Sequence, residues 1–259
     1  MSISPIGFFD SGIGGVSVWR EVKKLLPNEN TMYYADSKNS PYGSKSTSEI
    51  QNISIKNSKW LIDRGCKLIV VACNTATTNA VNMLRKKFEK IPFVGIEPGI
   101  KPALKESKKG KIGVLATKGT LSSELFEKTS QTINLSEINI IEGHGDGIVE
   151  IIESGDYDSD KLKALLIKYL NPMIEYGIDQ LVLGCTHYFL AQDLIQKIVG
   201  DKVVINNYNV AVASQVKRIL RKENMFNTEK NEIYNDFYTN GNKFALHNIL
   251  DKKNSVIKL

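Results

Sequence analysis

The sequence predicts an α/β protein of two similar, pseudo-symmetric, three-layer domains with mainly parallel sheets. Short apolar runs alternate with helix-like segments along almost the whole chain, which is typical of strands joined by crossover helices. The alternation breaks at Glu97-Pro98-Gly99 and then starts again, which indicates a second domain. The two halves also carry similar segments, because IGFFDSG at residues 6–12 is echoed by IGVLATKGT at 112–120.

The first series of elements opens with an apolar strand, after which Gly12, Gly14 and Gly15 turn the chain into a helix. The run at residues 68–72 is β-branched and bounded by polar residues, as expected for a central strand buried on both faces. The predicted strands are 6–9, 32–35, 68–72 and 93–96, and the helices between them end near Pro27 or cover 46–64 and 80–90.

The second series repeats this order after residue 98. Its predicted strands are 112–116, 138–141, 180–183 and 203–205, with helices between them. A helix at 210–222, an exposed loop at 223–231 and a strand–helix pair at 233–250 follow, and we expect these to return to the first domain. The predicted division is therefore 1–97 plus 210–259 for the first domain and 98–209 for the second.

Composition excludes several classes of protein. The chain has 259 residues, 42% of them hydrophobic, and its apolar stretches are shorter than the roughly 18 residues of a membrane span. The N-terminus lacks a basic region followed by a long apolar segment, so we expect a cytoplasmic protein without membrane association. The net charge of +6 is spread along the chain without a nucleic-acid-binding motif, so no nucleic-acid partner is expected.

Two cysteines lie in matching positions of the two series. VVACNTATT at residues 70–78 and LVLGCTHY at 181–188 each place a thiol, Cys73 and Cys185, after an apolar strand and before a helix. Ligands of open α/β sheets bind outside the carboxyl ends of the strands, so the two thiols are expected to flank one cleft. A helix N-terminus also stabilises negative charge, which favours the thiolate of Cys73.

Two thiols on opposite sides of a small substrate suit inversion of a stereocentre. That reaction removes a proton from one face of a carbon and returns one to the other face, so one base per face is the economical geometry. Asp10, which ends the first strand, and His187, two residues beyond Cys185, are the expected neighbours that tune or relay protons. We therefore predict Cys73, Cys185, Asp10 and His187 as the catalytic residues.

Simpler interpretations cover other residues. Cys66 follows Gly65 at a helix end and is expected to serve packing, and the three cysteines have no spacing typical of disulfides. A zinc site from Cys73, Cys185 and His187 lacks a ligand-spacing signature, so no metal is expected. The glycines at 12, 14 and 15 do not complete the G-x-G-x-x-G pattern of nucleotide-binding loops.

An ordered set of motifs spanning residues 6–240 resembles the cofactor-independent aspartate/glutamate racemases. The motifs are FFDSGIGGVSV, ADSKNSPYGSKS, VACNTATT, VGIEPG, GVLATKGTLSS and LGCTHY, with a weaker FYTNG. The resemblance implies two α/β domains with the active site between them, no cofactor, and a homodimer. The contexts of the two thiols look like the glutamate branch, which implies interconversion of L- and D-glutamate for peptidoglycan, cell-wall biogenesis and cell shape.

The resemblance also implies roles for single residues. Cys73 would deprotonate D-glutamate and Cys185 would deprotonate L-glutamate. The segment 142–155 departs from the family pattern, although Glu153 aligns with an acidic position that is often given a site role. The residues implied to bind substrate are Asp10, Ser11, Tyr42, Gly43, Asn74, Thr75, Thr117, Thr120, Thr186 and His187.

Three alternative functions stay open at the level of sequence. An aspartate or hydantoin racemase would use the same scaffold and the same thiol pair. A non-catalytic amino-acid-binding module could share the two-lobed organisation, although the paired thiols count against it. A cysteine hydrolase using Cys185 and His187 would leave the second thiol unexplained.

Overall fold

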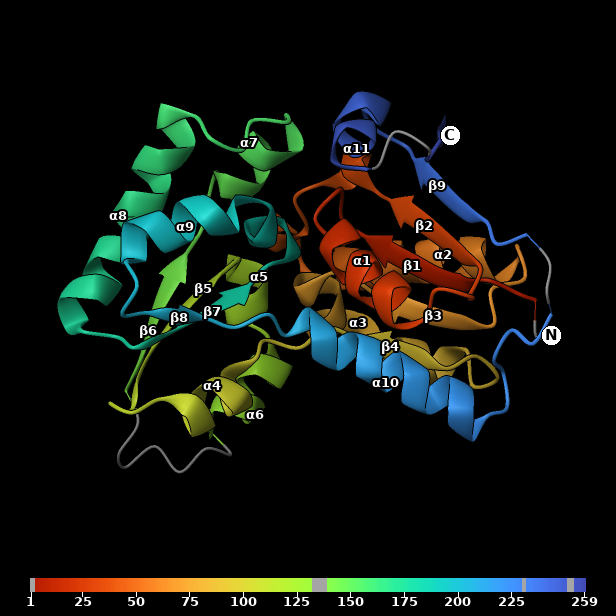
Figure 1. Ribbon diagram of the computed structural model, residues 1–259, viewed down its shortest axis with the longest axis horizontal. Helices are drawn as coiled ribbons and strands as arrows, with labels where there is room; N and C mark the ends of the chain where they lie inside the picture. Colours follow the sequence, from red (N-terminus) through yellow and green to blue (C-terminus); the bar gives the residue numbers. More distant parts are fainter. Residues whose placement is uncertain (1–2, 132–138, 230–231, 251–253) are drawn as a thin grey trace.

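The computed structural model describes residues 3–131, 139–229, 232–250 and 254–259 and has two lobes, each built on one parallel sheet (Figure 1). The first lobe contains a six-stranded sheet in the order β10-β9-β2-β1-β3-β4. Its strands are β1 Ile6–Asp10, β2 Thr31–Ala35, β3 Leu68–Val71, β4 Phe93–Gly95, β9 Asn235–Thr239 and β10 Val256–Lys258. All five strand pairings in this sheet are parallel.

Helices cover both faces of this sheet because its central strands are apolar on both sides. On β1, Phe8 packs in one core cluster with residues of α1 and α10, whereas Phe9 packs in another with residues of α2 and α3. The helices of the first lobe are α1 Val16–Leu25, α2 Thr47–Ile62, α3 Asn74–Lys87, α10 Asn209–Lys222 and α11 Lys243–Ile249, with short 3-10 helices η1 Ser37–Asn39 and η2 Tyr42–Ser44. This lobe therefore has three layers.

The second lobe contains a four-stranded parallel sheet in the order β6-β5-β7-β8. Its strands are β5 Lys111–Ala116, β6 Asn139–His144, β7 Gln180–Gly184 and β8 Val204–Ile205. Its helices are α4 Ile100–Glu106, α5 Lys118–Leu121, α6 Glu124–Gln131, α7 Ile148–Glu153, α8 Asp160–Tyr176, η3 Thr186–Ala191 and α9 Gln192–Val199. None of the helices in the described part of the chain is long and apolar enough to cross a membrane.

The predicted α/β class with two parallel sheets is confirmed, and several of the differences lie at element ends. The helix after Cys73 begins at Asn74, six residues before the predicted start at Ala80, because Cys73 itself caps it by accepting from the N–H of Ala76. The helix predicted at 46–64 begins where expected, because Ser46 and Glu49 form a reciprocal capping box. The predicted strand at 138–141 begins at residue 139 in the described part of the chain.

The C-terminal segment was the least defined part of the sequence pattern. Strand β9 joins the first sheet beside β2, with Phe237 opposite Tyr33. Strand β10 was not predicted from the sequence, and it extends the same sheet at its edge. The chain thus returns to the first sheet after passing through the second lobe.

A buried ion pair lies at the amino-terminal end of β3, opposite the end that carries Cys73. Lys67 Nζ lies 2.7 Å from Glu29 Oε2, and each side chain is only 3% exposed. Glu29 Oε1 also accepts a hydrogen bond from the N–H of Asn227, across 2.8 Å, and so ties the C-terminal segment to the first sheet. Removing one partner of such a pair leaves the other charge buried without compensation.

We therefore predict that Lys67→Met lowers the free energy of unfolding by about 3–5 kcal/mol. The matched control is Lys59→Met, which removes an exposed pair with Asp63 and should cost at most about 1 kcal/mol. Urea denaturation followed by circular dichroism measures both changes. Equal losses in the two variants would contradict the prediction.

Candidate active site

Strand ends from both lobes meet where the lobes touch. Asp10 ends β1 and Cys73 follows β3 in the first lobe, while Thr117 follows β5 and Cys185 follows β7 in the second. The hydroxyl of Thr186 lies 3.4 Å from Asp10 Oδ2 and donates to it across the lobe contact. The exposed fractions of Asp10, Cys73 and Cys185 are 0%, 4% and 7%, so all three residues are buried. The structure therefore places both thiols in the buried contact between the lobes.

The thiol of Cys73 lies at the N-terminus of α3, as expected, but it is not a stable thiolate there. Burial raises its pKa well above the usual value, and the charges of Asp10 and Cys185 raise it further. The N–H of Ala76 and the hydroxyl of Ser11, 3.5 Å and 3.8 Å from the sulfur, oppose this shift and are outweighed. The expectation that the helix end favours the thiolate is wrong for this state of the site, because loss of hydration outweighs the helix dipole.

The carboxylate of Asp10 is held by backbone groups of the turn between β1 and α1. Its Oδ2 accepts from the N–H of Gly15 across 2.6 Å, and its Oδ1 accepts from the N–H of Ser11 across 2.8 Å. Burial raises the pKa of Asp10 to about 6, although His187 and these two donors act in the opposite direction. Asp10 is therefore a better proton acceptor near neutral pH than an ordinary aspartate.

The thiol of Cys185 contacts His187, and His187 in turn contacts Glu153. Cys185 Sγ lies 3.8 Å from His187 Nδ1, and His187 Nε2 lies 2.5 Å from Glu153 Oε1. The same carboxylate oxygen accepts from the N–H of Ile13 across 2.7 Å, so Glu153 also bridges the two lobes. A Cβ atom at Gly12 would approach this oxygen to 1.9 Å, so a side chain at this position would displace the carboxylate of Glu153 from His187 and Ile13.

The His187–Glu153 contact has a clear electrostatic direction. Burial lowers the pKa of His187, but the hydrogen bonds with Cys185 and Glu153 and the charges of Glu153 and Asp10 outweigh it and raise this pKa well above its usual value. Burial raises the pKa of Glu153, yet the hydrogen bond and charge of His187 lower it overall. The pair is therefore an imidazolium and a carboxylate at neutral pH.

Three threonines join the lobes beside the thiols. Thr75 Oγ1 lies 2.8 Å from Thr117 Oγ1 and 3.1 Å from Thr120 Oγ1, and the last two lie 3.1 Å apart. Gly43 lies against Thr117, because a Cβ atom built on Gly43 would come within 2.6 Å of Thr117 Cβ. Among the described residues, the buried Oδ1 of Asn74 has no hydrogen-bond partner, which leaves one acceptor in this region for a ligand.

Sequence reasoning missed Asp36, which lies one residue beyond β2 at the same sheet edge. It accepts hydrogen bonds from the hydroxyl of Tyr42 across 2.5 Å and from the amide of Asn57 across 3.3 Å. Its other oxygen accepts from the amides of Asn39 and Asn240. An aspartate directly after a predicted strand was the signal that could have identified this anchor.

Two further residues that the sequence singled out are Cys66 and Glu153. Cys66 is buried at the opposite end of β3 from Cys73, where a Cβ atom on Gly7 would come within 2.9 Å of its sulfur. Within the described part of the chain, no group of three His, Cys, Asp or Glu side chains is arranged to hold a metal ion. Glu153 contacts Nε2 of His187, whereas Cys185 contacts Nδ1 of the same ring, so the imidazole lies between the carboxylate and the thiol.

Two α/β lobes that bring Cys73 and Cys185 into one buried contact define a two-lobed α/β protein with its candidate site between the lobes. Residues 10–214 match the model of the Asp/Glu/Hydantoin racemase family. A glutamate racemase of Clostridium perfringens is 42% identical over 250 residues, which cover 96% of this chain and 93% of that protein. The chain therefore belongs to the Asp/Glu/Hydantoin racemase family and is an isomerase.

Two solved structures are similar to this chain over its full length. A glutamate racemase isoform of Bacillus anthracis is 30% identical, with a TM-score of 0.87 and coverage of 100% of this chain and 98% of that chain. A glutamate racemase of Francisella tularensis, solved in complex with D-glutamate, is 26% identical with a TM-score of 0.85, and the coverage is again 100% and 98%. The two-lobed arrangement is therefore that of the family.

The ion pair between His187 and Glu153 predicts that the pKa of His187 depends on Glu153. In Glu153→Gln the anionic partner is lost while burial still disfavours the imidazolium, so the pKa of His187 should fall. The imidazole signal in a nuclear magnetic resonance titration measures this change and is assigned by its absence in His187→Gln. Glu150→Gln, an exposed position on the same helix, is the control and should leave the signal unchanged. An unaltered midpoint in Glu153→Gln would refute the ion pair.

Proposed function

We propose that this protein interconverts L-glutamate and D-glutamate by a two-base proton transfer at Cα. The observation that carries the proposal is the pair of buried thiols, Cys73 and Cys185, which follow corresponding strands of two lobes and meet at the lobe contact. Each thiol has its own neighbour for proton exchange, on one side Ser11 and Asp10 and on the other His187. Inversion at a carbon needs this arrangement of one acid–base group per face.

The choice of glutamate is supported by the relatives. The Clostridium perfringens protein named glutamate racemase shares 42% of its residues with this chain over nearly its full length. The structure from Francisella tularensis contains D-glutamate in the same fold. Aspartate or hydantoin racemisation is the alternative, since the family description includes all three substrates.

In the direction from D- to L-glutamate, the thiolate of Cys73 takes the proton from Cα, and an S–H bond forms as the C–H bond breaks. The thiol of Cys185 then gives its proton to the opposite face of the carbanion and becomes the thiolate. The reverse direction exchanges the two roles. The proposed proton-transfer steps use no cofactor, so addition of pyridoxal phosphate should leave the rate of racemisation unchanged.

The two thiols of the site differ in the groups that lie beside them. Cys73 donates to Ser11, and the Ser11 hydroxyl in turn lies 3.4 Å from Asp10 Oδ1, so we infer a proton path from the thiol to this carboxylate. On the other side, the imidazolium of His187 lies 3.8 Å from the sulfur of Cys185. Glu153 keeps that imidazolium protonated and is therefore a positioning residue in the proposal.

The remaining predicted residues would bind the substrate. Hydroxyl and amide groups, together with backbone N–H groups at helix N-termini, can hold two carboxylates without a bulky cation beside the reacting carbon. The unpartnered Oδ1 of Asn74 suits the ammonium group. The proposed set is Asp10, Ser11, Tyr42, Gly43, Asn74, Thr75, Thr117, Thr120, Thr186 and His187.

The proposal extends to organisation and biological role. The first domain would comprise 1–97 plus 210–259, and the second 98–209, and the division of the strands between two sheets supports this proposal. A homodimer and a cytoplasmic location are part of the same proposal. The product D-glutamate would serve peptidoglycan synthesis and thereby cell-wall biogenesis and cell shape.

The two-base assignment predicts the effect of removing either sulfur. Cys73→Ser and Cys185→Ser should each lower racemisation of both glutamate enantiomers by at least about 10²-fold, because each loses one acid–base group. Polarimetry with L- and D-glutamate measures the rate. Cys66→Ser is the matched control, since this buried thiol lies at the other end of β3, and it should keep the turnover number.

Other outcomes separate the alternatives. Full activity in either active-site variant would exclude two bases, and turnover of aspartate but not glutamate by the unaltered protein would exclude glutamate as substrate. Deuterium from solvent at Cα distinguishes catalysis from simple amino-acid binding. A trapped covalent acyl-enzyme on Cys185 would instead favour a hydrolase.

A further inference from the structure

Substrate cannot reach the thiols while the lobes stay in contact. Asp10 is fully buried, and Cys73 and Cys185 are only 4% and 7% exposed. Binding and release therefore require the lobes to separate, and the contacts that cross between them determine how readily they do so. The question is which of these contacts belong to residues outside the catalytic site.

Most of the side-chain hydrogen bonds between the lobes involve residues already placed in or beside the site. Thr186 donates to Asp10, the N–H of Ile13 donates to Glu153, and Thr75 contacts the threonines of the second lobe. Asn79 is different. It lies on α3, one turn beyond Thr75, and its amide Nδ2 donates across 2.9 Å to the carbonyl oxygen of Gly119 in α5 of the second lobe.

The surroundings of Asn79 fix the orientation of its amide. Nδ2 also contacts the carbonyl oxygen of Thr75 at 2.9 Å, and Oδ1 accepts from the hydroxyl of Thr47 at 3.1 Å. Turning the amide over would place an oxygen against two carbonyl oxygens, so only the observed orientation satisfies these groups. Gly119 also lies close to the 3-10 helix η2, because a Cβ atom there would come within 3.0 Å of the backbone oxygen of Gly43.

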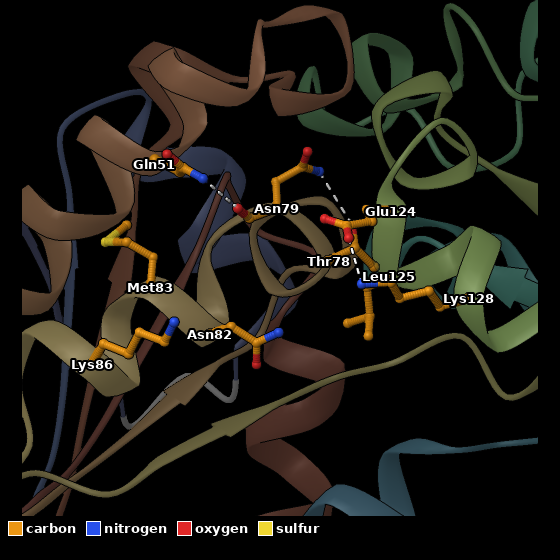
Figure 2. Close-up of a pocket in the computed structure, with 9 residues that line it drawn as sticks. All are labelled: Gln51, Thr78, Asn79, Asn82, Met83, Lys86, Glu124, Leu125 and Lys128. Atoms are coloured by element: carbon orange, nitrogen blue, oxygen red, sulfur yellow. Dashed lines mark hydrogen bonds and ion pairs between the residues drawn. The ribbon is translucent and has the colours of Figure 1, made fainter.

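Asn79 lines a surface groove rather than the catalytic site. Figure 2 shows the residues that line this groove, most of which come from α3 of the first lobe and α6 of the second. The volume of the groove is about 400 Å³. Asn82 lies on the next turn of α3 and lines the same groove, but its Oδ1 accepts from Arg85 of its own helix. The two asparagines therefore form a matched pair, one that crosses to the second lobe and one that does not.

We propose that the Asn79–Gly119 hydrogen bond is a latch that holds the lobes closed from outside the catalytic site. Asn79 is in this sense a positioning residue that controls access to Cys73 and Cys185. The role of closure in catalysis rests on the proposed racemase function, whereas the latch itself can be tested without substrate. The three cysteines of this chain supply the readout, since Cys66 lies in the core of the first lobe.

The experiment compares Asn79→Asp and Asn79→Ala with Asn82→Asp in the full-length protein. Iodoacetamide labelling, followed by peptide mass spectrometry, gives a separate rate for each cysteine. Asn79→Asp places carboxylate oxygens against two carbonyls, and Asn79→Ala removes the donor without adding charge. In both, labelling of Cys73 and Cys185 should rise about tenfold, the effect of losing roughly one hydrogen bond, while Cys66 keeps its rate.

Each other outcome overturns the latch. Unchanged labelling of Cys73 and Cys185 would show that Asn79 does not hold the lobes. A parallel rise at Cys66 would show general destabilisation of the first lobe, and an equal response in Asn82→Asp would show that the crossing hydrogen bond is irrelevant. Failure of the unaltered protein to turn over glutamate would defeat the proposed function but would leave these labelling rates readable.

Discussion

Loss of hydration at the contact between the lobes is the constraint on which the rest of the site depends. It raises the pKa of Cys73 well above the usual range and that of Asp10 to about 6. The same burial makes hydrogen bonds and charge–charge interactions at the contact stronger than they would be in water. The thiol of Cys73 and the imidazole of His187 are therefore both protonated while the lobes are in contact.

The two halves of the site are similar in backbone but different in charge. Each thiol follows a parallel strand, yet Cys73 faces a hydroxyl and a carboxylate, whereas Cys185 faces an imidazolium supported by Glu153. In the proposed reaction, this duplicated framework would place one thiol on each side of the substrate carbon. The neighbours would then provide a proton acceptor on one side and a positive charge on the other, which suits the proposed reaction because it must run in both directions.

The glycine-rich turn after β1 is explained by the approach of the lobes. A Cβ atom at Gly12 would collide with the carboxylate of Glu153, and one at Gly14 would come within 2.5 Å of the backbone nitrogen of His187. The turn therefore brings backbone N–H groups directly to Asp10 and Glu153. The glycines that could suggest a nucleotide-binding loop instead allow two sheets to share one site.

The sequence by itself determined the parallel α/β class, the strand ends that carry Asp10, Cys73 and Cys185, and the neighbour His187, because apolar periodicity and turn residues are local signals. Only the tertiary structure decided the partner of His187, the anchoring of Tyr42 by Asp36 and the protonated state of Cys73. Glu153 is 34 positions from His187, and the hydration of a thiol depends on every segment packed around it. Such contacts and energies arise only when the lobes come together, so no local pattern encodes them.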